Sequence, residues 1–85
     1  MNIQQMAALA RAHWKEVNPE VYQKMVDRNA LGEESEAAAK LTQMEMNTLM
    51  LLKISEQEAW QQSRHLFIYV TKDQLEEMYH PEDEE

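Results

Sequence analysis

The hydrophobic pattern is strongest between Ser35 and Leu52, a stretch of good helix formers without glycine or proline. Five residues recur there at intervals of four and three, the spacing of one helix face: Ala37, Leu41, Met44, Thr48 and Leu51. Ala38, Leu49 and Leu52 widen this stripe. The second half is apolar on nearly every side, which is typical of a helix surrounded by protein. We therefore expect a central helix over 35–53, with shorter helices packed around it.

Capping residues divide the N-terminal part into two helices. An apolar stripe predicts the first helix, over 2–17: Ile3, Met6, Ala7, Ala10, Trp14 and Val17. Asn18-Pro19 ends it, because proline disfavours helical backbone in the preceding residue. The same dipeptide starts the second helix, with Asn18 as the N-cap and Pro19 at the first helical position. We expect Gly32 to end that helix in the left-handed conformation.

Two further caps follow the central helix. Ser55 and Glu58 form a capping-box pattern, which predicts a fourth helix whose apolar positions continue to Val70. Thr71 begins a second pattern of this kind, with Gln74 three residues later. A short fifth helix is expected there, ended by His80-Pro81. The sequence thus predicts an all-α fold: a small helical bundle of four main helices plus a short C-terminal helix and an acidic tail.

Length and composition set limits on the class of protein. Eighty-five residues predict one helical domain over 1–80, followed by a disordered acidic tail over 81–85. A core of this size gives roughly 3–5 kcal/mol of stability, so an oligomer is a common solution. One glycine and two prolines are too few for an all-β fold, and no cysteine is present. No signal peptide or membrane span is recognisable, which predicts a cytoplasmic protein.

The net charge of −8 is unevenly distributed. Residues 1–72 carry nine acidic and eight basic side chains, whereas residues 73–85 carry seven acidic and none that is basic. Binding to nucleic acid needs a basic face that neutralises phosphates. We therefore expect no direct nucleic-acid binding.

Motifs for catalysis are not found in the sequence. It contains no glycine-rich phosphate loop, no nucleophile elbow and no His-Glu-x-x-His zinc pattern. His13 and Glu16 share a helix face, but the di-iron pattern runs in the opposite order and needs further glutamates. We predict no enzymatic activity, no catalytic residue, no cofactor and no metal.

The seven methionines suggest a protein-binding role. Methionine fills irregular gaps in a core, but flexible methionine-rich surfaces also adapt to partners. A domain this small can hardly cover every side of the central helix by itself. We therefore predict a protein that binds itself or a host protein through apolar helix faces. The predicted contact residues are Met46, Met50, Trp60 and Phe67.

The acidic C-terminus supports an alternative. Its carboxylates could imitate the charge of phosphates and occupy the nucleic-acid groove of another protein. The chain would then be an acidic inhibitor, and the residues involved would be Glu76, Glu77, Glu82, Asp83, Glu84 and Glu85.

Two groups of residues carry a resemblance to known sequences. The first is Leu9, Trp14, Pro19, Tyr22 and Leu31, and the second is Glu58, Ala59, Trp60, Arg64 and Leu66. With them the chain resembles small uncharacterised helical proteins of phages, prophages and transposons, over roughly residues 7–67. The transposon-encoded TnpV proteins look similar in the first part. The resemblance implies an origin in a mobile element and implies no activity or residue role.

Overall fold

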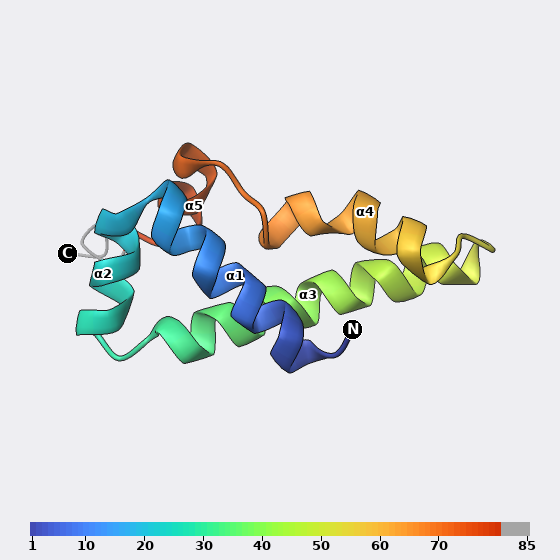
Figure 1. The fold of residues 1–85 in the computed structure, drawn as a ribbon, viewed down its shortest axis with the longest axis horizontal. Coiled ribbons are helices and arrows are strands. Elements are labelled where there is room, and N and C mark those ends of the chain that lie inside the picture. Colours follow the sequence, from blue (N-terminus) through green and yellow to red (C-terminus); the bar gives the residue numbers. More distant parts are fainter. Residues whose placement is uncertain (81–85) are drawn as a thin grey trace.

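The computed structural model describes residues 1–80 and shows five helices in that part of the chain (Figure 1). They are α1 (Ile3–Val17), α2 (Pro19–Asp27), α3 (Leu31–Leu51), α4 (Glu56–Phe67) and α5 (Lys72–Met78). Across residues 1–80 all regular secondary structure is helical, so the expected all-α class is confirmed. The acidic tail expected over 81–85 lies outside the described residues.

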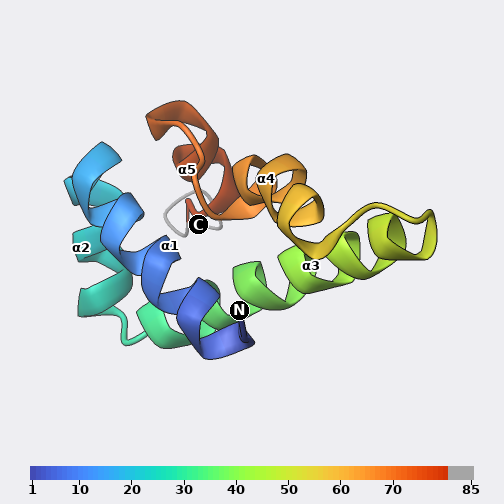
Figure 2. The same cartoon turned by 45° about the vertical axis from the view of Figure 1, so that its right-hand side comes forward.

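The 21-residue helix α3 is the longest element, and the other helices are arranged along it. Both α1 and α4 pack against α3. In Figures 1 and 2 they lie on the same side of it, and none of the five helices in residues 1–80 covers the opposite side. The molecule is elongated, 44 × 21 × 20 Å. The long helix is therefore enclosed on one side only.

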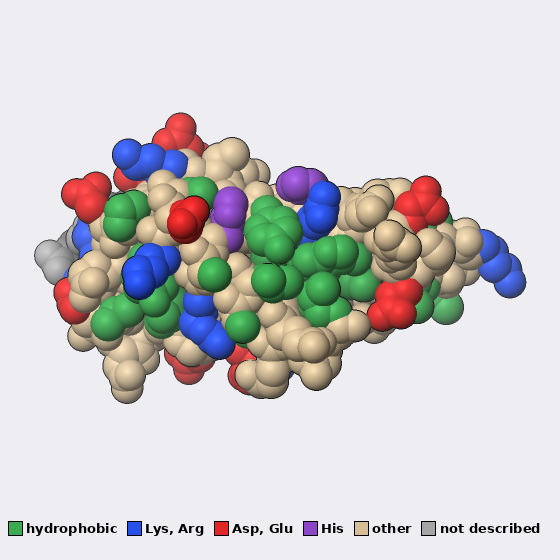
Figure 3. Space-filling model, viewed as in Figure 1, with side chains coloured by type: hydrophobic (Ala, Val, Ile, Leu, Met, Phe, Trp, Pro, Cys, Tyr) green, Lys and Arg blue, Asp and Glu red, His purple; other side chains and the backbone are tan. Residues whose placement is uncertain are grey.

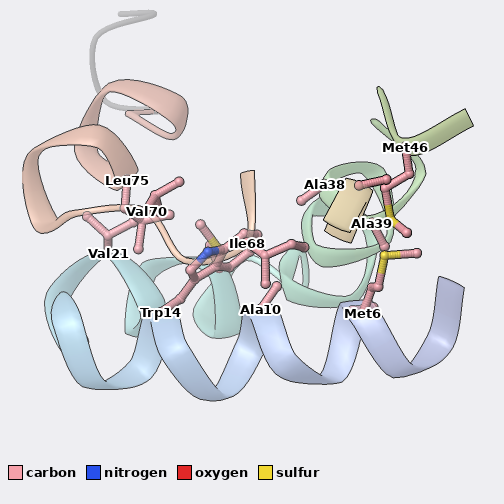
Figure 4. Packing of buried hydrophobic residues seen from close by; sticks show 13 residues of the cluster. Met6, Ala10, Trp14, Val21, Ala38, Ala39, Met46, Ile68, Val70 and Leu75 are labelled. Carbon is pink, nitrogen blue, oxygen red and sulfur yellow. The ribbon is translucent and has the colours of Figure 1, made fainter. Parts of the chain in front are cut away.

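The hydrophobic core lies between α1 and the inner side of α3. Trp14 of α1 is 1% exposed and lies near the middle of the buried cluster (Figure 4). Figure 4 shows Val21, Val70 and Leu75 toward one end of the cluster and Met6, Ala39 and Met46 toward the other. The core therefore joins segments from both ends of the chain.

Asn18 connects three helices through one buried side chain. It is 1% exposed and is both the C-cap of α1 and the N-cap of α2, as the Asn18-Pro19 pattern predicts. Its Oδ1 accepts a hydrogen bond from the Val21 amide at 3.2 Å. Its Nδ2 donates to the Lys72 carbonyl, also at 3.2 Å, which attaches the start of α5 to the α1–α2 corner. A buried amide satisfied in this way fixes the geometry of the junction.

The boundaries of the central helix differ from the prediction. α3 begins at Leu31 and includes Gly32, so the expected C-cap role of this glycine is wrong. Asn29 adopts the left-handed conformation instead, with a φ of 59°. Asparagine tolerates this region better than most residues, which makes the turn possible two residues after the end of α2. At the other end, α3 stops at Leu51 and Lys53 is left-handed, with a φ of 73°.

The fourth helix is shorter than its apolar pattern suggests. α4 ends at Phe67, and the expected continuation to Val70 is wrong. Ile68 and Val70 leave the helix and are buried in the core, and His13 donates from Nε2 to the Val70 carbonyl at 2.8 Å. Both predicted N-caps are present, but only the second of them is a complete capping box. Ser55 accepts from the Glu58 amide, and Thr71 forms a complete capping box with Gln74.

Candidate protein-interaction surfaces

The face of α3 that is turned away from α1 and α4 is apolar. We call it the outer stripe, defined as Ala37, Leu41, Met44, Thr48 and Leu51. All five side chains are exposed. The exposed fraction is 45% for Leu41, 63% for Met44 and 81% for Leu51. These are the residues whose spacing predicted a buried face, so that expectation is wrong.

The inner face of α3 carries smaller side chains. Its buried residues are Ser35, Ala38, Ala39, Thr42 and Met46. Alanine and serine allow a neighbouring helix to approach closely. Threonine is accommodated because the Thr42 hydroxyl donates to the Ala38 carbonyl at 2.9 Å. Met46 is the one large side chain among these buried residues, and Leu31 and Leu49 pack partly buried against the same core. The approach of α1 and α4 thus uses small residues in the middle of α3 and leaves Leu41 and Leu51 outside.

The exposed apolar surface continues past the C-terminal end of α3. Leu52 is 68% exposed and follows Leu51 directly. The main chain then turns through Lys53 and Ile54 into α4, and the Ile54 amide donates back to the Leu49 carbonyl. Monomeric proteins seldom leave several neighbouring large apolar side chains in water without a use for them. The outer stripe with Leu52 is therefore a candidate interaction surface.

The four predicted contact residues do not form one exposed surface. Met46 is 1% exposed and belongs to the core cluster, so it contributes packing and no accessible contact area. Met50 is 40% exposed, one turn after Met46. Trp60 and Phe67 are half-buried and pack against the core. The sequence pattern identified apolar positions but could not separate those that support the core from those that face water.

Met46 and Trp60 nevertheless meet beside a shallow hollow of about 220 Å³. Met1, Glu56 and Gln57 complete its lining. The N-terminal amino group lies 3.6 Å from Glu56 across it, a surface ion pair of small energetic value. Figure 3 shows apolar side chains grouped between α1 and α4, next to histidine side chains. This hollow is a secondary candidate, because most of its apolar lining is occupied in holding α4 on α3.

An aromatic group around Tyr69 was not anticipated from the sequence. The Tyr69 ring makes edge contacts with His13 and Trp60, at centroid distances of 5.2 and 6.0 Å. The Arg64 guanidinium lies 5.8 Å from the centre of the same ring. Since His13 also bonds the Val70 carbonyl, these contacts fix the turn between α4 and α5. They give His13 a structural role, whereas its neighbour on the same face, Glu16, is exposed.

Acidic side chains gather where α5 approaches α2. Glu20, Asp73, Glu76 and Glu77 line an open hollow of about 590 Å³, together with Val21, Lys24, Tyr79 and His80. Glu76 and Glu77, named in the acidic alternative, are exposed on α5. The remaining members of that alternative, Glu82, Asp83, Glu84 and Glu85, lie outside the described residues.

One carboxyl group in the described chain has a shifted pKa. Partial burial raises the pKa of Glu34 above its ordinary value, and the neighbouring charge of Glu33 adds to the effect. Both residues lie in the first turn of α3, where a negative charge interacts favourably with the helix dipole. Glu34 therefore marks the polar end of α3, one turn before the outer stripe begins.

Residues 1–80 contain neither a cluster of metal-binding side chains nor a helix that could span a membrane. No three His, Cys, Asp or Glu side chains group closely enough there to hold a metal ion. None of the helices in that range combines the length and apolar character needed to cross a membrane. Comparisons with models of protein families, with curated proteins and with solved structures find no match to this chain.

Proposed function

We propose that this chain is a small non-enzymatic protein that acts by binding another protein, either a further copy of itself or a foreign one, through the outer stripe of α3. The observation that supports the proposal is the exposure of Leu41, Met44 and Leu51 on one face of the central helix. An amphipathic helix whose apolar face lies in water is the element that many protein–protein contacts use.

The proposed surface differs from the contact set inferred from the sequence. Met46 is assigned to the core, and Met50, one turn later on the same side of α3, is 40% exposed but does not belong to the outer stripe. Trp60 and Phe67 hold α4 in place and so support the surface indirectly. The origin in a phage or another mobile element remains a proposal that rests on the sequence resemblance.

Site-specific photocrosslinking tests the proposal directly. A benzophenone amino acid replaces Met44 in the outer stripe and, as a control, Gln61, which is exposed on α4. After irradiation of cells that produce each variant, we expect covalent protein adducts at position 44 and few at position 61. Equal yields from both positions, or no adduct at 44, would contradict the proposal. Circular dichroism establishes that both variants remain helical.

A second candidate function uses the acidic side chains around α5. Asp73, Glu76 and Glu77 present carboxylates beside Glu20 of α2, and this arrangement favours a basic partner. Such binding should weaken steeply with salt, because exposed charges are screened within about 10 Å at 0.1 M ionic strength. Binding through the outer stripe should change little. The salt dependence of a partner complex therefore separates the two functions.

A further inference from the structure

The spacing of the outer stripe indicates the kind of surface that would cover it. Its intervals of four and three make a seven-residue repeat, with Ala37, Met44 and Leu51 at one position and Leu41 and Thr48 at the other. Two helices that carry this repeat insert the side chains of each into the spaces of the other. The outer stripe therefore has the spacing that matches a second stripe of the same kind.

We infer that the occupant of the outer stripe is a second copy of this chain, with its α3 antiparallel to the first. This inference rests on the proposed function and names the partner of the same surface. Closed two-fold dimers are the commonest assemblies of identical chains, and they use the same patch on both subunits.

The size of the side chains favours the antiparallel orientation. The stripe begins with the small Ala37 and ends with the large Leu51, which is 81% exposed and adjoins Leu52. Antiparallel packing places the small end of each copy against the large end of the other, so that the two surfaces complement each other. Parallel packing would bring the leucines together at one end and leave a gap between the alanines at the other.

Charge at the two ends favours the same orientation. Glu33, Glu34 and Glu36 lie in the first turns of α3, and Lys53 follows its C-terminus. An antiparallel pair brings the carboxylates of each copy toward Lys53 of the other copy and also opposes the two helix dipoles. A parallel pair would place Glu33 and Glu34 of one copy beside the same residues of the other, whereas Glu36 is paired with Lys40 of its own helix at 3.7 Å.

The area of the outer stripe, and the free approach of a second copy to it, are sufficient for a weak dimer. From the exposed fractions, the outer stripe offers roughly 500 Å² per chain, so two stripes face to face would bury about 1,000 Å², the lower range of specific interfaces. Because α1 and α4 lie on the other side of α3, neither blocks the approach of a second copy (Figure 2). A concentration-dependent dimer is therefore expected.

Sedimentation equilibrium with matched variants tests this inference. The wild type, Met44→Lys and Met78→Lys are compared from about 1 μM to about 1 mM, the range in which a weak dimer forms. Met78 is 41% exposed on α5, so it receives the same substitution away from the stripe. We expect the wild type and Met78→Lys to reach twice the mass of one 10.1 kDa chain. Met44→Lys should weaken the dimer roughly 100-fold or more, because it buries one ammonium group of each copy in the interface.

The outcomes of this test separate the inference from the proposed function. In one outcome the wild type stays monomeric, and the photocrosslinking variant at position 44 forms an adduct with a protein of a different mass. This result overturns the second-copy inference and supports the proposed function. A monomer that forms no adduct overturns both. A dimer that Met44→Lys leaves intact, with helicity unchanged, shows that another surface associates and overturns the inference.

Cysteine pairs test the orientation, because the natural chain contains no cysteine. Positions 37 and 51 are fourteen residues apart, about 21 Å along a helix, whereas a disulfide needs Cα atoms within about 7 Å. In an antiparallel dimer, a mixture of Ala37→Cys and Leu51→Cys should crosslink far more than either variant alone. Efficient crosslinking of each variant with itself would instead show a parallel pair and overturn the orientation.

Discussion

The two faces of α3 show that the hydrophobicity of a side chain does not by itself decide whether it is buried in this molecule. The inner face is buried and carries Ser35, two alanines, Thr42 and Met46. The outer face is exposed although it carries two leucines and Met44. The inner face is buried because small side chains let α1 and α4 approach. The outer face retains hydrophobic surface that residues 1–80 leave uncovered.

Replacing one methionine on each face gives the largest expected difference. Met46→Ala empties a core position that is 1% exposed and should cost about 2–4 kcal/mol of unfolding free energy. Met44→Ala, at a position 63% exposed, should change it by less than about 0.5 kcal/mol. Urea unfolding followed by circular dichroism measures both, at a concentration that keeps the chain monomeric. Equal losses would show that the two faces are equally buried.

Enlarging an alanine on each face tests the role of small residues. Ala39→Leu adds three carbons where α3 is fully buried, and overpacking of this kind should cost about 1–3 kcal/mol. Ala37→Leu makes the same change in the outer stripe and should leave the unfolding free energy of the monomer nearly unchanged. The same urea titration applies. If Ala39→Leu proved as stable as the wild type, the close approach of the neighbouring helices would not depend on a small residue there.

Removing a hydroxyl from each face should have a smaller effect. Thr42 and Thr48 both donate to the carbonyl four residues earlier, at 2.9 and 3.2 Å, but only Thr42 is buried. Thr42→Val removes a buried hydrogen bond and should cost about 1 kcal/mol. Thr48→Val removes an exposed bond that water replaces, so thermal unfolding should occur within a degree or two of the wild type. A larger loss for Thr48→Val would indicate that its face is covered.

The smallest expected effect concerns the polar end of α3. Because burial raises the pKa of Glu34, the folded chain holds this proton more tightly than the unfolded chain does. The charged form of Glu34 therefore lowers the free energy of unfolding at pH values above its ordinary pKa of 4.5. This loss of stability disappears as the pH falls through the raised pKa and Glu34 binds its proton. Glu34→Gln should raise the unfolding midpoint slightly at pH 7 but not at pH 4. Glu20→Gln, at an exposed position in the first turn of α2, is the control. A lower midpoint for Glu34→Gln at pH 7 would contradict this account.

Local signals in the sequence predicted much of the fold. Asn18-Pro19, Ser55 and Thr71 each mark a helix start that the structure contains, because a cap depends on residues three positions away. The features that the sequence did not predict depend on packing between segments that lie far apart in the chain. Ile68 and Val70 fit a helical spacing, yet the helix ends before them because the core beside Trp14 buries them in the turn that follows α4.

The sequence predicted which residues form the candidate surface, but it did not predict that this surface is exposed. The four-three spacing identifies Leu41, Met44 and Leu51 as one face, and that grouping is correct. Which face is buried depends on where α1 and α4 approach α3, and the contact is made at Ala38 and Ala39. Alanine contributes little to a hydrophobic pattern, so a reading based on hydrophobicity selects the leucine face.

Methionine oxidation tests the central claim most directly, because the two faces of α3 each carry a methionine within one turn. The folded chain is treated with hydrogen peroxide, and peptide mass spectrometry follows Met44, Met46 and the exposed reference Met78. Since oxidation follows exposure, Met44 should react at least as fast as Met78 in dilute solution, and Met46 roughly tenfold more slowly or less. At high protein concentration only Met44 should become protected. Equal rates for Met44 and Met46 in dilute solution would contradict the assignment of the inner and outer faces.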